Sequence, residues 1–360
     1  MTGPALNPDD GWDDLAGDVQ RLDSLARVTA ERDRLARQLA EVKHRRADYL
    51  ETVHQAVEDS VGRIRIAPVD ARRQFAVLSP AGEQEEYAVA LLSDIQTGKI
   101  TPDYNSEVAR ARVLKYAEKI VKLANIQRQD HPVDHCVVSM LGDLVEGVDI
   151  FPGQQWLIDS TLYDQVFNTT PVILADFVRY LLAHFETVTV YAVDGNHGRL
   201  GRKGMFGPAD NADKMVARVL QLLLRDEPRF QLVQRDPAGE RNWYQIMELG
   251  NYKALQIHGD QIRGHSGFPW YGLGKKVQGW GSGGLGADSG FLDVHMGHWH
   301  QRASIPLNHR TVWVNGSTES TNTYAAENLA AQSEPSQWLL FVDPAKGRVT
   351  ASYGVDLREE

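Results

Sequence analysis

The chain has 360 residues, a formal net charge of −10 at pH 7, and contents of 42% hydrophobic and 24% charged residues. That length suffices for one large domain or two ordinary ones, and the composition is typical of a soluble globular protein. The acidic balance argues against a protein that coats nucleic acid non-specifically, although it leaves room for an enzyme with a local basic patch.

The only cysteine, Cys136, excludes an intrachain disulfide and a zinc cage of thiolates, and it favours a reducing, cytoplasmic compartment. No apolar stretch approaches the roughly 20 residues that cross a bilayer. The acidic N-terminal segment lacks the basic and apolar regions of a secretory signal. We therefore expect no membrane association.

Residues 12–61 carry a helical pattern in which apolar residues alternate at spacings of three and four. Arg32 and Arg46 fall on the apolar seam, and charges of both signs fill the other faces. The pattern predicts a coiled coil or a long docking helix, through which the chain would form a homo-oligomer or bind a partner protein. A solvated helical arm without a partner is the alternative. We expect residues 1–61, an acidic tail and this helix, to precede one larger domain over residues 62–360.

The first half of the larger domain alternates strands with helices. Short strands are expected at Arg63–Ile66 and Gln74–Leu78, and buried strands at Tyr87–Leu92, Asp134–Leu141 and Val188–Val193. Apolar spacing predicts helices over residues 106–127 with Ser106 as the N-cap, 159–185 with a break at Pro171, and 210–225. This β-α order indicates a layered α/β domain.

A second group of strands follows. A second sheet, packed face to face on the first with helices outside, is the simplest way to bury these strands. The predicted fold class is therefore α/β, a two-sheet β-sandwich flanked by helices and preceded by the long N-terminal helix. A loop rich in glycine and aromatic residues, Arg263 to Gly290, interrupts the group, and loops of that length are usually functional or disordered. The predicted strands are Tyr244–Leu249, Lys253–His258, Asp293–Met296, Thr311–Val314, Trp338–Val342 and Val349–Tyr353.

Five strand ends carry polar side chains of one kind. At the central one, Gly195 and Gly198 let the chain turn sharply and expose Asn196 and His197. In open α/β sheets, ligands collect at the carboxyl ends of the strands. Mixed oxygen and nitrogen ligands without sulfur suit divalent ions such as Mn²⁺, Fe²⁺, Zn²⁺ or Mg²⁺. The other four stretches are Asp94-Ile95-Gln96, Gly142-Asp143, His258-Gly259-Asp260 and Gly297-His298-Trp299-His300.

In this order the five stretches resemble the signature of the calcineurin-like metallophosphoesterase superfamily, D-x-H, G-D, G-N-H, H and G-H-x-H. The match spans roughly residues 87–317 and includes the turn Asn315-Gly316-Ser317. The resemblance implies a four-layer αββα fold and a phosphoester hydrolase with two divalent ions. Mn²⁺ is the expected metal, with Mg²⁺, Fe²⁺ or Zn²⁺ as alternatives.

The resemblance also assigns roles to the individual residues. Asp143 would bridge the two ions, and His197 would bind no metal but would hydrogen-bond the phosphate and stabilise or protonate the leaving oxygen. Asp194 and Asp260 are candidates for orienting the imidazoles, with a capping or turn role as the alternative. One ion would take Asp94, Gln96 and His300, and the other would take Asn196, His258 and His298.

The chain departs from the family pattern at Gln96, where histidine is common. An amide oxygen is a weaker and harder donor than imidazole, so we expect a looser first metal site that prefers Mn²⁺ or Mg²⁺ over Zn²⁺. The alternative is that Gln96 does not bind metal and that one site has degenerated.

Basic residues point to the substrate. Arg199, Arg202 and Lys203 directly follow the central turn, where a polyanionic chain could bind. The long loop interleaves cations with aromatic rings, a mixture that suits single-stranded or splayed nucleic acid, and a solvated basic rim is the alternative. The loop residues concerned are Arg263, Lys275 and Lys276 with Phe268, Trp270, Tyr271 and Trp280.

These features resemble the SbcD-like and phage-type nuclease branch, so we expect a phosphodiesterase or nuclease that cleaves DNA. The chain departs from that branch by having GNHG where those enzymes usually have GNHD. Two other functions stay open. One is a small-molecule or protein phosphoesterase, such as a cyclic nucleotide phosphodiesterase or a phosphatase. The other is a weakly catalytic scaffold that assembles through the N-terminal helix.

Overall fold

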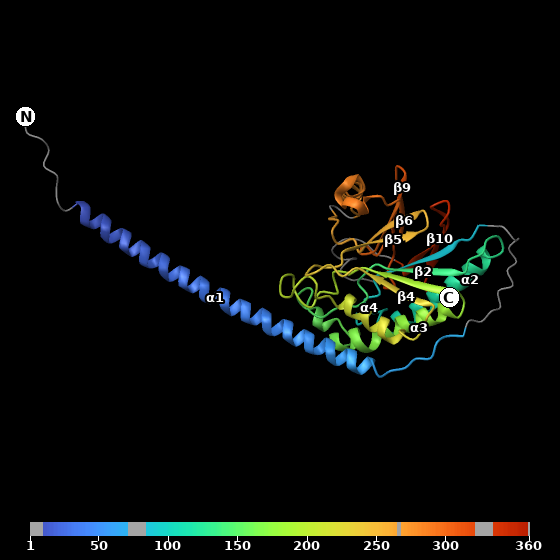
Figure 1. The fold of residues 1–360 in the computed structure, drawn as a ribbon, viewed down its shortest axis with the longest axis horizontal. Helices are drawn as coiled ribbons and strands as arrows, with labels where there is room; N and C mark the ends of the chain where they lie inside the picture. Colours follow the sequence, from blue (N-terminus) through green and yellow to red (C-terminus); the bar gives the residue numbers. More distant parts are fainter. Residues whose placement is uncertain (1–9, 71–83, 265–267, 321–333, 359–360) are drawn as a thin grey trace, which may run out of the picture. The chain divides into compact units, whose positions relative to one another are not determined.

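The computed structural model of the chain describes residues 10–70, 84–264, 268–320 and 334–358. The predicted strand Gln74–Leu78 lies outside these residues. The chain divides into two units, Met1–Ala56 and Val57–Glu360. The first unit holds most of helix α1 (Asp10–Val61), and the second unit holds both sheets (Figure 1).

Helix α1 confirms the predicted N-terminal helix and runs for 52 residues. Its sequence is rich in Ala, Leu, Arg and Glu, which have high helix propensity. Large apolar side chains of the predicted seam are exposed, and Leu35 and Leu39 are each 56% exposed. Its last turn is tied to the rest of the second unit, because Glu58 forms an ion pair with Arg218 at 2.9 Å. A coiled-coil partner for this helix stays a prediction.

The first sheet combines parallel and antiparallel strands in the order β11-β10-β1-β2-β3-β4. The four strands from β1 to β4 run parallel, with Val89 opposite Val137 and Val137 opposite Thr189. β10 pairs with β1 in the antiparallel direction, and β11 pairs with β10. The bounds are β1 (Tyr87–Leu92), β2 (His135–Met140), β3 (Thr187–Ala192), β4 (Phe230–Gln234), β10 (Ser336–Asp343) and β11 (Arg348–Asp356).

The second sheet has the order β5-β6-β7-β9-β8. β6, β7 and β9 run parallel, and an antiparallel strand closes each edge. The bounds are β5 (Tyr244–Leu249), β6 (Tyr252–Ile257), β7 (Asp293–Met296), β8 (Ala303–Leu307) and β9 (Arg310–Val314).

Helices cover the outer face of each sheet. Figure 1 shows α2 (Ser106–Gln127), α3 (Thr170–Leu182) and α4 (Ala212–Leu223) against the first sheet. On the second sheet, Leu273 and Val277 of α5 (Trp270–Gly279) belong to one buried cluster with strand residues of β6, β7 and β9. The resulting αββα layers confirm the predicted fold class. Shorter turns are η1 (Gln154–Trp156), η2 (Asp164–Thr169), η3 (Trp280–Gly284) and η4 (Gly286–Ser289).

The main core lies between the two sheets. Val89 and Val137 of the first sheet pack with Met247, Ala254 and Trp313 of the second. Complete burial of one side chain of this size contributes roughly 1.5–3 kcal/mol. Because both sheets share this core, their strand ends are held beside one another. Among the described residues, no helix has the length and apolar character needed to cross a membrane.

Several sequence predictions differ from the structure at sheet edges. The sequence pattern predicts β10 and β11 in the second sheet, but they extend the first, because an apolar run does not specify which of two stacked sheets it joins. The short edge strands β4 and β8 are not predicted. β8 contains Pro306, which lacks a backbone N–H and is tolerated only at a sheet edge.

Local boundaries differ as well. The N-cap of α2 is Asn105, whose Oδ1 accepts the N–H of Val108 at 2.9 Å, whereas Ser106 Oγ donates to Asp159. Residues 63–66 form no strand. The helix predicted over residues 159–185 is divided into η2 and α3, and Pro171 occupies the first turn of α3, where its missing N–H is not needed. The loop predicted from Arg263 to Gly290 contains α5.

Candidate metal centre

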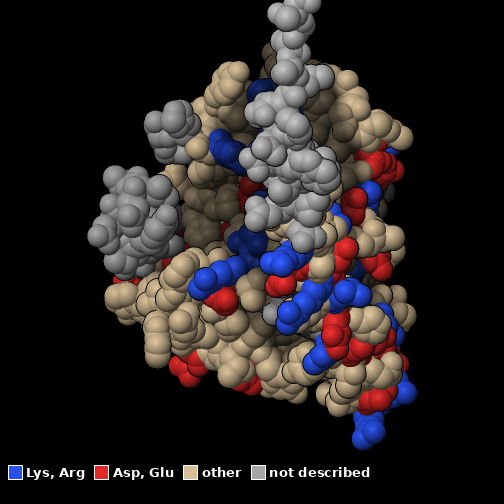
Figure 2. Space-filling view, turned by 90° about the vertical axis from the view of Figure 1, so that its left-hand side faces the viewer, with Lys and Arg blue, Asp and Glu red and all other residues tan. Residues whose placement is uncertain are grey.

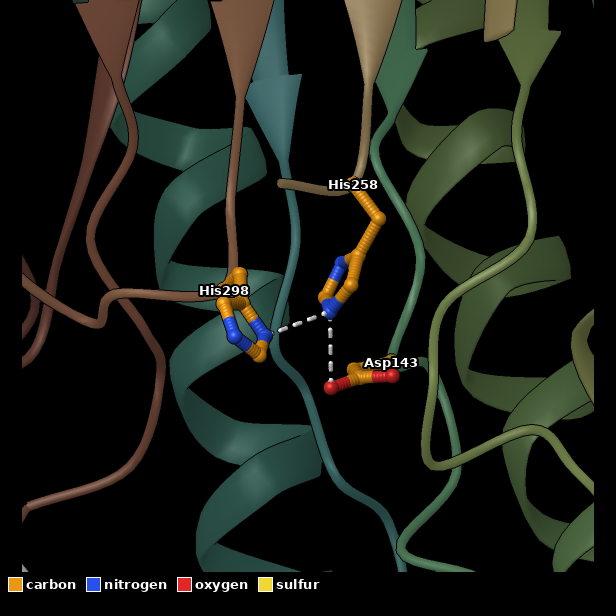
Figure 3. Close-up of side chains that lie close together, drawn as sticks. All are labelled: Asp143, His258 and His298. Carbon is orange, nitrogen blue, oxygen red and sulfur yellow. Dashed lines mark hydrogen bonds and ion pairs between the residues drawn. The ribbon is translucent and has the colours of Figure 1, made fainter. Parts of the chain in front are cut away.

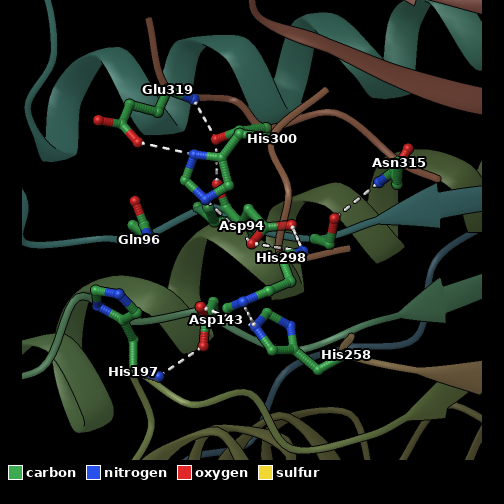
Figure 4. Close-up of polar contacts among 12 residues, drawn as sticks. Asp94, Gln96, Asp143, His197, His258, His298, His300, Asn315 and Glu319 are labelled. Carbon is green, nitrogen blue, oxygen red and sulfur yellow. Dashed lines mark hydrogen bonds and ion pairs between the residues drawn. The ribbon is translucent and has the colours of Figure 1, made fainter. Parts of the chain in front are cut away.

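The five polar stretches meet at one rim of the sandwich. Asp94 and Asp143 follow β1 and β2, Asn196 follows β3, and His258 and His298 follow β6 and β7. Figure 4 shows that side chains from both sheets point into one region. The rim therefore collects residues that lie far apart in the sequence, as the strand pattern predicts.

One group of ligand atoms surrounds His258 Nε2. This atom lies 3.0 Å from Asp143 Oδ2, 3.1 Å from Asn196 Oδ1 and 3.1 Å from His298 Nδ1 (Figure 3). The opposite ring nitrogen, Nδ1, donates to the Leu141 carbonyl at 2.8 Å. That bond fixes the ring and directs Nε2 toward the other ligands, which is how backbone partners orient metal-binding histidines.

A second group lies around Asp94. His300 Nε2 is 3.3 Å from Asp94 Oδ1, and Asp94 Oδ2 accepts the backbone N–H of His298 at 3.0 Å. Gln96 is near this group (Figure 4). Its Oε1 accepts a hydrogen bond from Lys99 Nζ at 3.0 Å. The structure thus brings together all seven predicted ligands, and Gln96 is hydrogen-bonded to Lys99.

The backbone of the ligands is strained. Asp94, Gln96, Asp143, His298 and His300 have φ values of 53°, 46°, 52°, 74° and 53°. Among the described residues other than glycine, only one further position has a positive φ. Such conformations cost about 1–3 kcal/mol each and gather at functional sites, where surrounding contacts maintain them.

Two glycines let the central turns approach each other. A Cβ on Gly142 would lie 2.5 Å from the backbone nitrogen of Gly195, and a Cβ on Gly195 would lie 2.1 Å from that of Asp143. The approach is completed by Asp213 of α4, whose carboxylate accepts the N–H groups of Asp143, Leu144 and Gly195 at 2.9, 3.0 and 2.8 Å. The sequence pattern does not indicate a role for Asp213, because an acidic residue in the first turn of a helix is common.

The electrostatics favour a bound cation. His258 and His197 hold the pKa of Asp143 well below its usual value despite its burial. Burial and the neighbouring His258 lower the pKa of His298 to about 4, so its imidazole is neutral and can donate a lone pair. A buried carboxylate beside imidazoles and amide oxygens fits a hard or borderline divalent ion.

His197 has a different environment from the ligands. Its Nδ1 lies 2.9 Å from the Glu146 carbonyl and 3.3 Å from Glu146 Oε2, and its backbone N–H donates to Asp143 Oδ1 at 2.7 Å. Burial alone would lower the pKa of His197, but Asp143 and Glu146 outweigh burial and raise it to about 9. The sequence pattern does not indicate a role for Glu146, although it follows Asp143 by only three residues.

Two residues proposed to orient the imidazoles do not do so. Asp260 pairs with Arg241 at 2.7 Å, and Asp194 accepts the backbone N–H of Asn242 at 3.0 Å. These contacts join distant segments of the chain and are neither caps nor turn contacts. Leu141, Glu146 and Glu319 contact the imidazoles instead.

The predicted substrate cations lie after the central turn. Arg199 is half-buried, and no hydrogen-bond partner for its Nε is found in the described part of the chain. Arg202 pairs with Asp149 at 3.1 Å, and Lys203 is exposed. On the face drawn in Figure 2, Lys and Arg side chains lie interspersed with Asp and Glu.

No family model and no curated protein matches the chain. Solved structures match it at low identity. A predicted phosphoesterase from Streptococcus pneumoniae is 13% identical, and the match covers 76% of this chain and 99% of that chain with a TM-score of 0.32. An archaeal phosphodiesterase is 10% identical over 74% and 99%, with a TM-score of 0.33. Vps29 from Entamoeba histolytica, complexed with Zn²⁺, is 12% identical over 75% and 99%, with a TM-score of 0.33.

The five stretches occur in the predicted order, and the sheets that carry them stack between layers of helices. In this motif order and in its αββα layers the chain resembles the calcineurin-like metallophosphoesterases, with Gln96 as the departure from the motifs.

Proposed function

We propose that the protein is a metal-dependent phosphoester hydrolase that cleaves phosphodiesters, with DNA as the preferred substrate. The observation that carries the proposal is the convergence of Asp143, His258 and His298, whose ligand atoms all lie within 4.8 Å of one another. Burying a carboxylate costs free energy unless a cation or hydrogen bonds compensate it. A divalent ion compensates this set of donors.

Two divalent ions, Mn²⁺ foremost, would be held by the residues that the resemblance assigns, with Asp143 between them. Bound ions of this kind lower the pKa of a water molecule and offset the charge on the attacking and leaving oxygens of a phosphate. The chain itself contributes the strained turns that carry Asp143 and His298.

His197 would act on the leaving group. Its Nδ1 is engaged by Glu146, so Nε2 is the atom available to a phosphate oxygen. With a pKa raised to about 9 by Asp143 and Glu146, against the effect of burial, the imidazolium can donate a proton at neutral pH. Proton donation of this type contributes about 10²- to 10⁴-fold to a rate.

A row of aromatic rings supports a nucleic-acid substrate. Trp299 lies 5.5 Å from His298 between ring centroids, Phe268 lies 5.8 Å from Trp299, and Trp270 lies 4.6 Å from Phe268. Trp270 and its neighbour Tyr271 are 63% and 83% exposed. Bases stack on exposed rings of this kind without sequence preference.

Cations accompany the aromatic row and the central turn. Lys275 lines the same open groove on α5 as Trp270 and Tyr271. Arg199 lies two residues after His197, is half-buried, and has an Nε without a hydrogen-bond partner in the described part of the chain. A polyanionic backbone bound at these places would meet positive charge.

A substrate panel with Mn²⁺ tests the proposal. It comprises labelled single- and double-stranded DNA and RNA, a cyclic nucleotide, a phosphopeptide and bis-p-nitrophenyl phosphate. We expect cleavage of DNA that disappears in Asp143→Asn. Turnover of small esters alone would replace the nuclease assignment by a small-molecule or protein phosphoesterase. Hydrolysis that Asp143→Asn leaves intact would refute the metal-dependent mechanism. No hydrolysis and no bound metal would also refute it and would favour a scaffold.

We also propose that residues 12–61 associate with a second copy of the chain. The described part of α1 exposes an apolar stripe at spacings of three and four, interrupted by Arg32. Such a stripe is buried when two helices form a coiled coil.

A further inference from the structure

The loop after β1 brings a cation to the candidate metal centre. The backbone N–H of Lys99 donates to the Gln96 carbonyl at 3.1 Å and closes a turn. This turn also brings the Lys99 ammonium group to the Gln96 side chain, where Nζ donates to Gln96 Oε1 at 3.0 Å. The Lys99 side chain is only 13% exposed. An ammonium group therefore contacts the oxygen atom that the family pattern would assign to a metal.

Glu319 holds this ammonium group in place. Its Oε1 lies 2.7 Å from Lys99 Nζ, and its Oε2 lies 3.1 Å from His300 Nδ1. Figure 4 shows Glu319 beside His300. The side chain of Glu319 is 2% exposed. Its backbone N–H donates to Ser317 Oγ, which in turn donates to the Asp94 carbonyl, both at 2.8 Å. Glu319 thus ties Lys99 to two ligands of the first predicted metal site.

The buried ion pair is difficult to open. If Lys99 moved away, Glu319 Oε1 would lose its ion pair with the ammonium group while remaining out of water, and breaking a buried pair is strongly destabilising. An ammonium group and a divalent ion also repel each other at short range. A metal at Gln96 would therefore have to displace Lys99 or bind beside its charge.

We propose that Lys99, held by Glu319, weakens metal binding at the position of Asp94, Gln96 and His300. The centre then binds one ion tightly, through Asp143, Asn196, His258 and His298, and a second ion weakly. This inference rests on the proposed function of the site. Its consequence is that the occupied state of the centre depends on the concentration of free Mn²⁺, so hydrolysis rises as Mn²⁺ reaches the range of the weaker position.

Mn²⁺ titration of the metal-free full chain tests the inference, by calorimetry and by elemental analysis after gel filtration. We expect the wild type to retain one ion per chain through gel filtration. Lys99→Met should retain two, with a dissociation constant of the second ion at least about tenfold lower than in the wild type. Electron paramagnetic resonance should show a coupled Mn²⁺ pair in this variant at two equivalents.

Two further variants isolate the charge. Lys99→Gln is neutral but keeps hydrogen-bond donors for Gln96 and Glu319, and it should show the same gain; it also serves if Lys99→Met does not fold. Lys253→Met removes an exposed ammonium group that pairs with Glu248 at 2.7 Å, and it should bind Mn²⁺ like the wild type.

The outcomes separate this inference from the proposed function. A wild type that binds two ions equally tightly would overturn the inference and leave the proposed function intact, as would a second ion that binds no tighter in either Lys99 variant. Absence of Mn²⁺ binding in every protein, including the wild type, would refute the proposed function itself.

Discussion

The carboxylate of Asp213 accepts the backbone N–H of Asp143 at 2.9 Å, so a residue of α4 fixes the turn that presents the central candidate ligand. The same carboxylate also accepts the N–H groups of Leu144 and Gly195. One buried side chain therefore joins the turns that follow β2 and β3, and the geometry of the centre depends on a helix outside it.

Asp213→Asn tests this dependence. An amide has one acceptor oxygen, so at least one of the three backbone N–H groups loses its partner, and each such loss costs about 1–3 kcal/mol. We expect urea unfolding of the metal-free protein at a lower midpoint, together with weaker Mn²⁺ binding. Asp226→Asn, which removes the exposed pair with Arg65, should change the free energy of unfolding by less than about 0.5 kcal/mol. Equal midpoints for the two variants would contradict the role of Asp213.

His197→Ala should separate chemistry from metal binding. The imidazole contacts Glu146 and is not among the grouped ligand atoms, so we expect unchanged Mn²⁺ content. Loss of a group that stabilises the leaving oxygen should lower kcat by about 10²- to 10³-fold. Steady-state kinetics with elemental analysis check both results, and the exposed His309→Ala serves as the control. Lost metal in His197→Ala would show a structural or ligand role instead.

Trp270→Ala should affect long substrates selectively. Stacking of a base on an aromatic ring contributes about 1–3 kcal/mol, so KM for single-stranded DNA should rise by about 5- to 100-fold. The rate with bis-p-nitrophenyl phosphate should not change, because this ester lacks the neighbouring nucleotides that would extend along the row of rings to α5. Equal losses with both substrates would mean that Trp270 supports the fold and not the substrate.

His295 makes folding depend on pH. It is buried between the sheets, 3.1 Å from the Tyr252 hydroxyl and 3.4 Å from Ser139 Oγ. Burial lowers its pKa from 6.5 to about 3. The unfolded chain therefore binds a proton below pH 6.5 that the folded chain excludes, so the stabilisation is complete above pH 6.5 and declines as pH falls toward 3.

His295→Gln should remove this decline. Between pH 6.5 and 5 the wild type should lose about 2 kcal/mol more of its unfolding free energy than the variant does. Urea denaturation at several pH values measures the difference, and the slopes are compared because the substitution also changes the absolute stability. Parallel curves for the two proteins would rule out His295 as the cause.

Substitution on the apolar stripe of α1 tests self-association. Leu35→Glu with Leu39→Glu places charge on the stripe, and we expect an oligomeric wild type to become monomeric. Ala40→Glu, on the outward side of the heptad pattern, should leave the mass unchanged. Light scattering after gel filtration measures the mass. A monomeric wild type at micromolar concentration would refute association with a second copy.

The fold class and the meeting of the five stretches could be predicted from the sequence. Runs such as Tyr87–Leu92 are continuous and apolar because both faces of a central strand are buried, and their ends are marked by polar residues. Parallel strands place those ends at one rim. The sheet that each strand joins could not be predicted. β10 joins the first sheet because it pairs with β1, which lies far away in the sequence.

The residues that support the ligands could not be identified in this way. Glu146 and Glu319 occur in irregular segments, where no periodicity assigns a direction to a side chain. The bond between Lys99 and Gln96 depends on a tight turn, and the sequence gives no sign of it beyond the proximity of the two residues. Contacts that support the ligands depend on tertiary packing, which the sequence pattern does not reveal. The ligands themselves can be predicted, because a metal ion accepts only a few residue types.

The close approach of Gly142 and Gly195 shows that the chain must satisfy a requirement of the fold as well as one of catalysis. Because these residues have no side chain, the turns after β2 and β3 can pack against each other. This packing is required by the fold and does not depend on whether the protein hydrolyses phosphoesters. A descendant that lost its enzymatic role would be free to change its histidines, but a methyl group at either glycine would force the neighbouring loops apart. Among homologous sequences, the paired glycines would therefore indicate that the fold is retained. The histidines would distinguish the active enzymes from those that have lost activity.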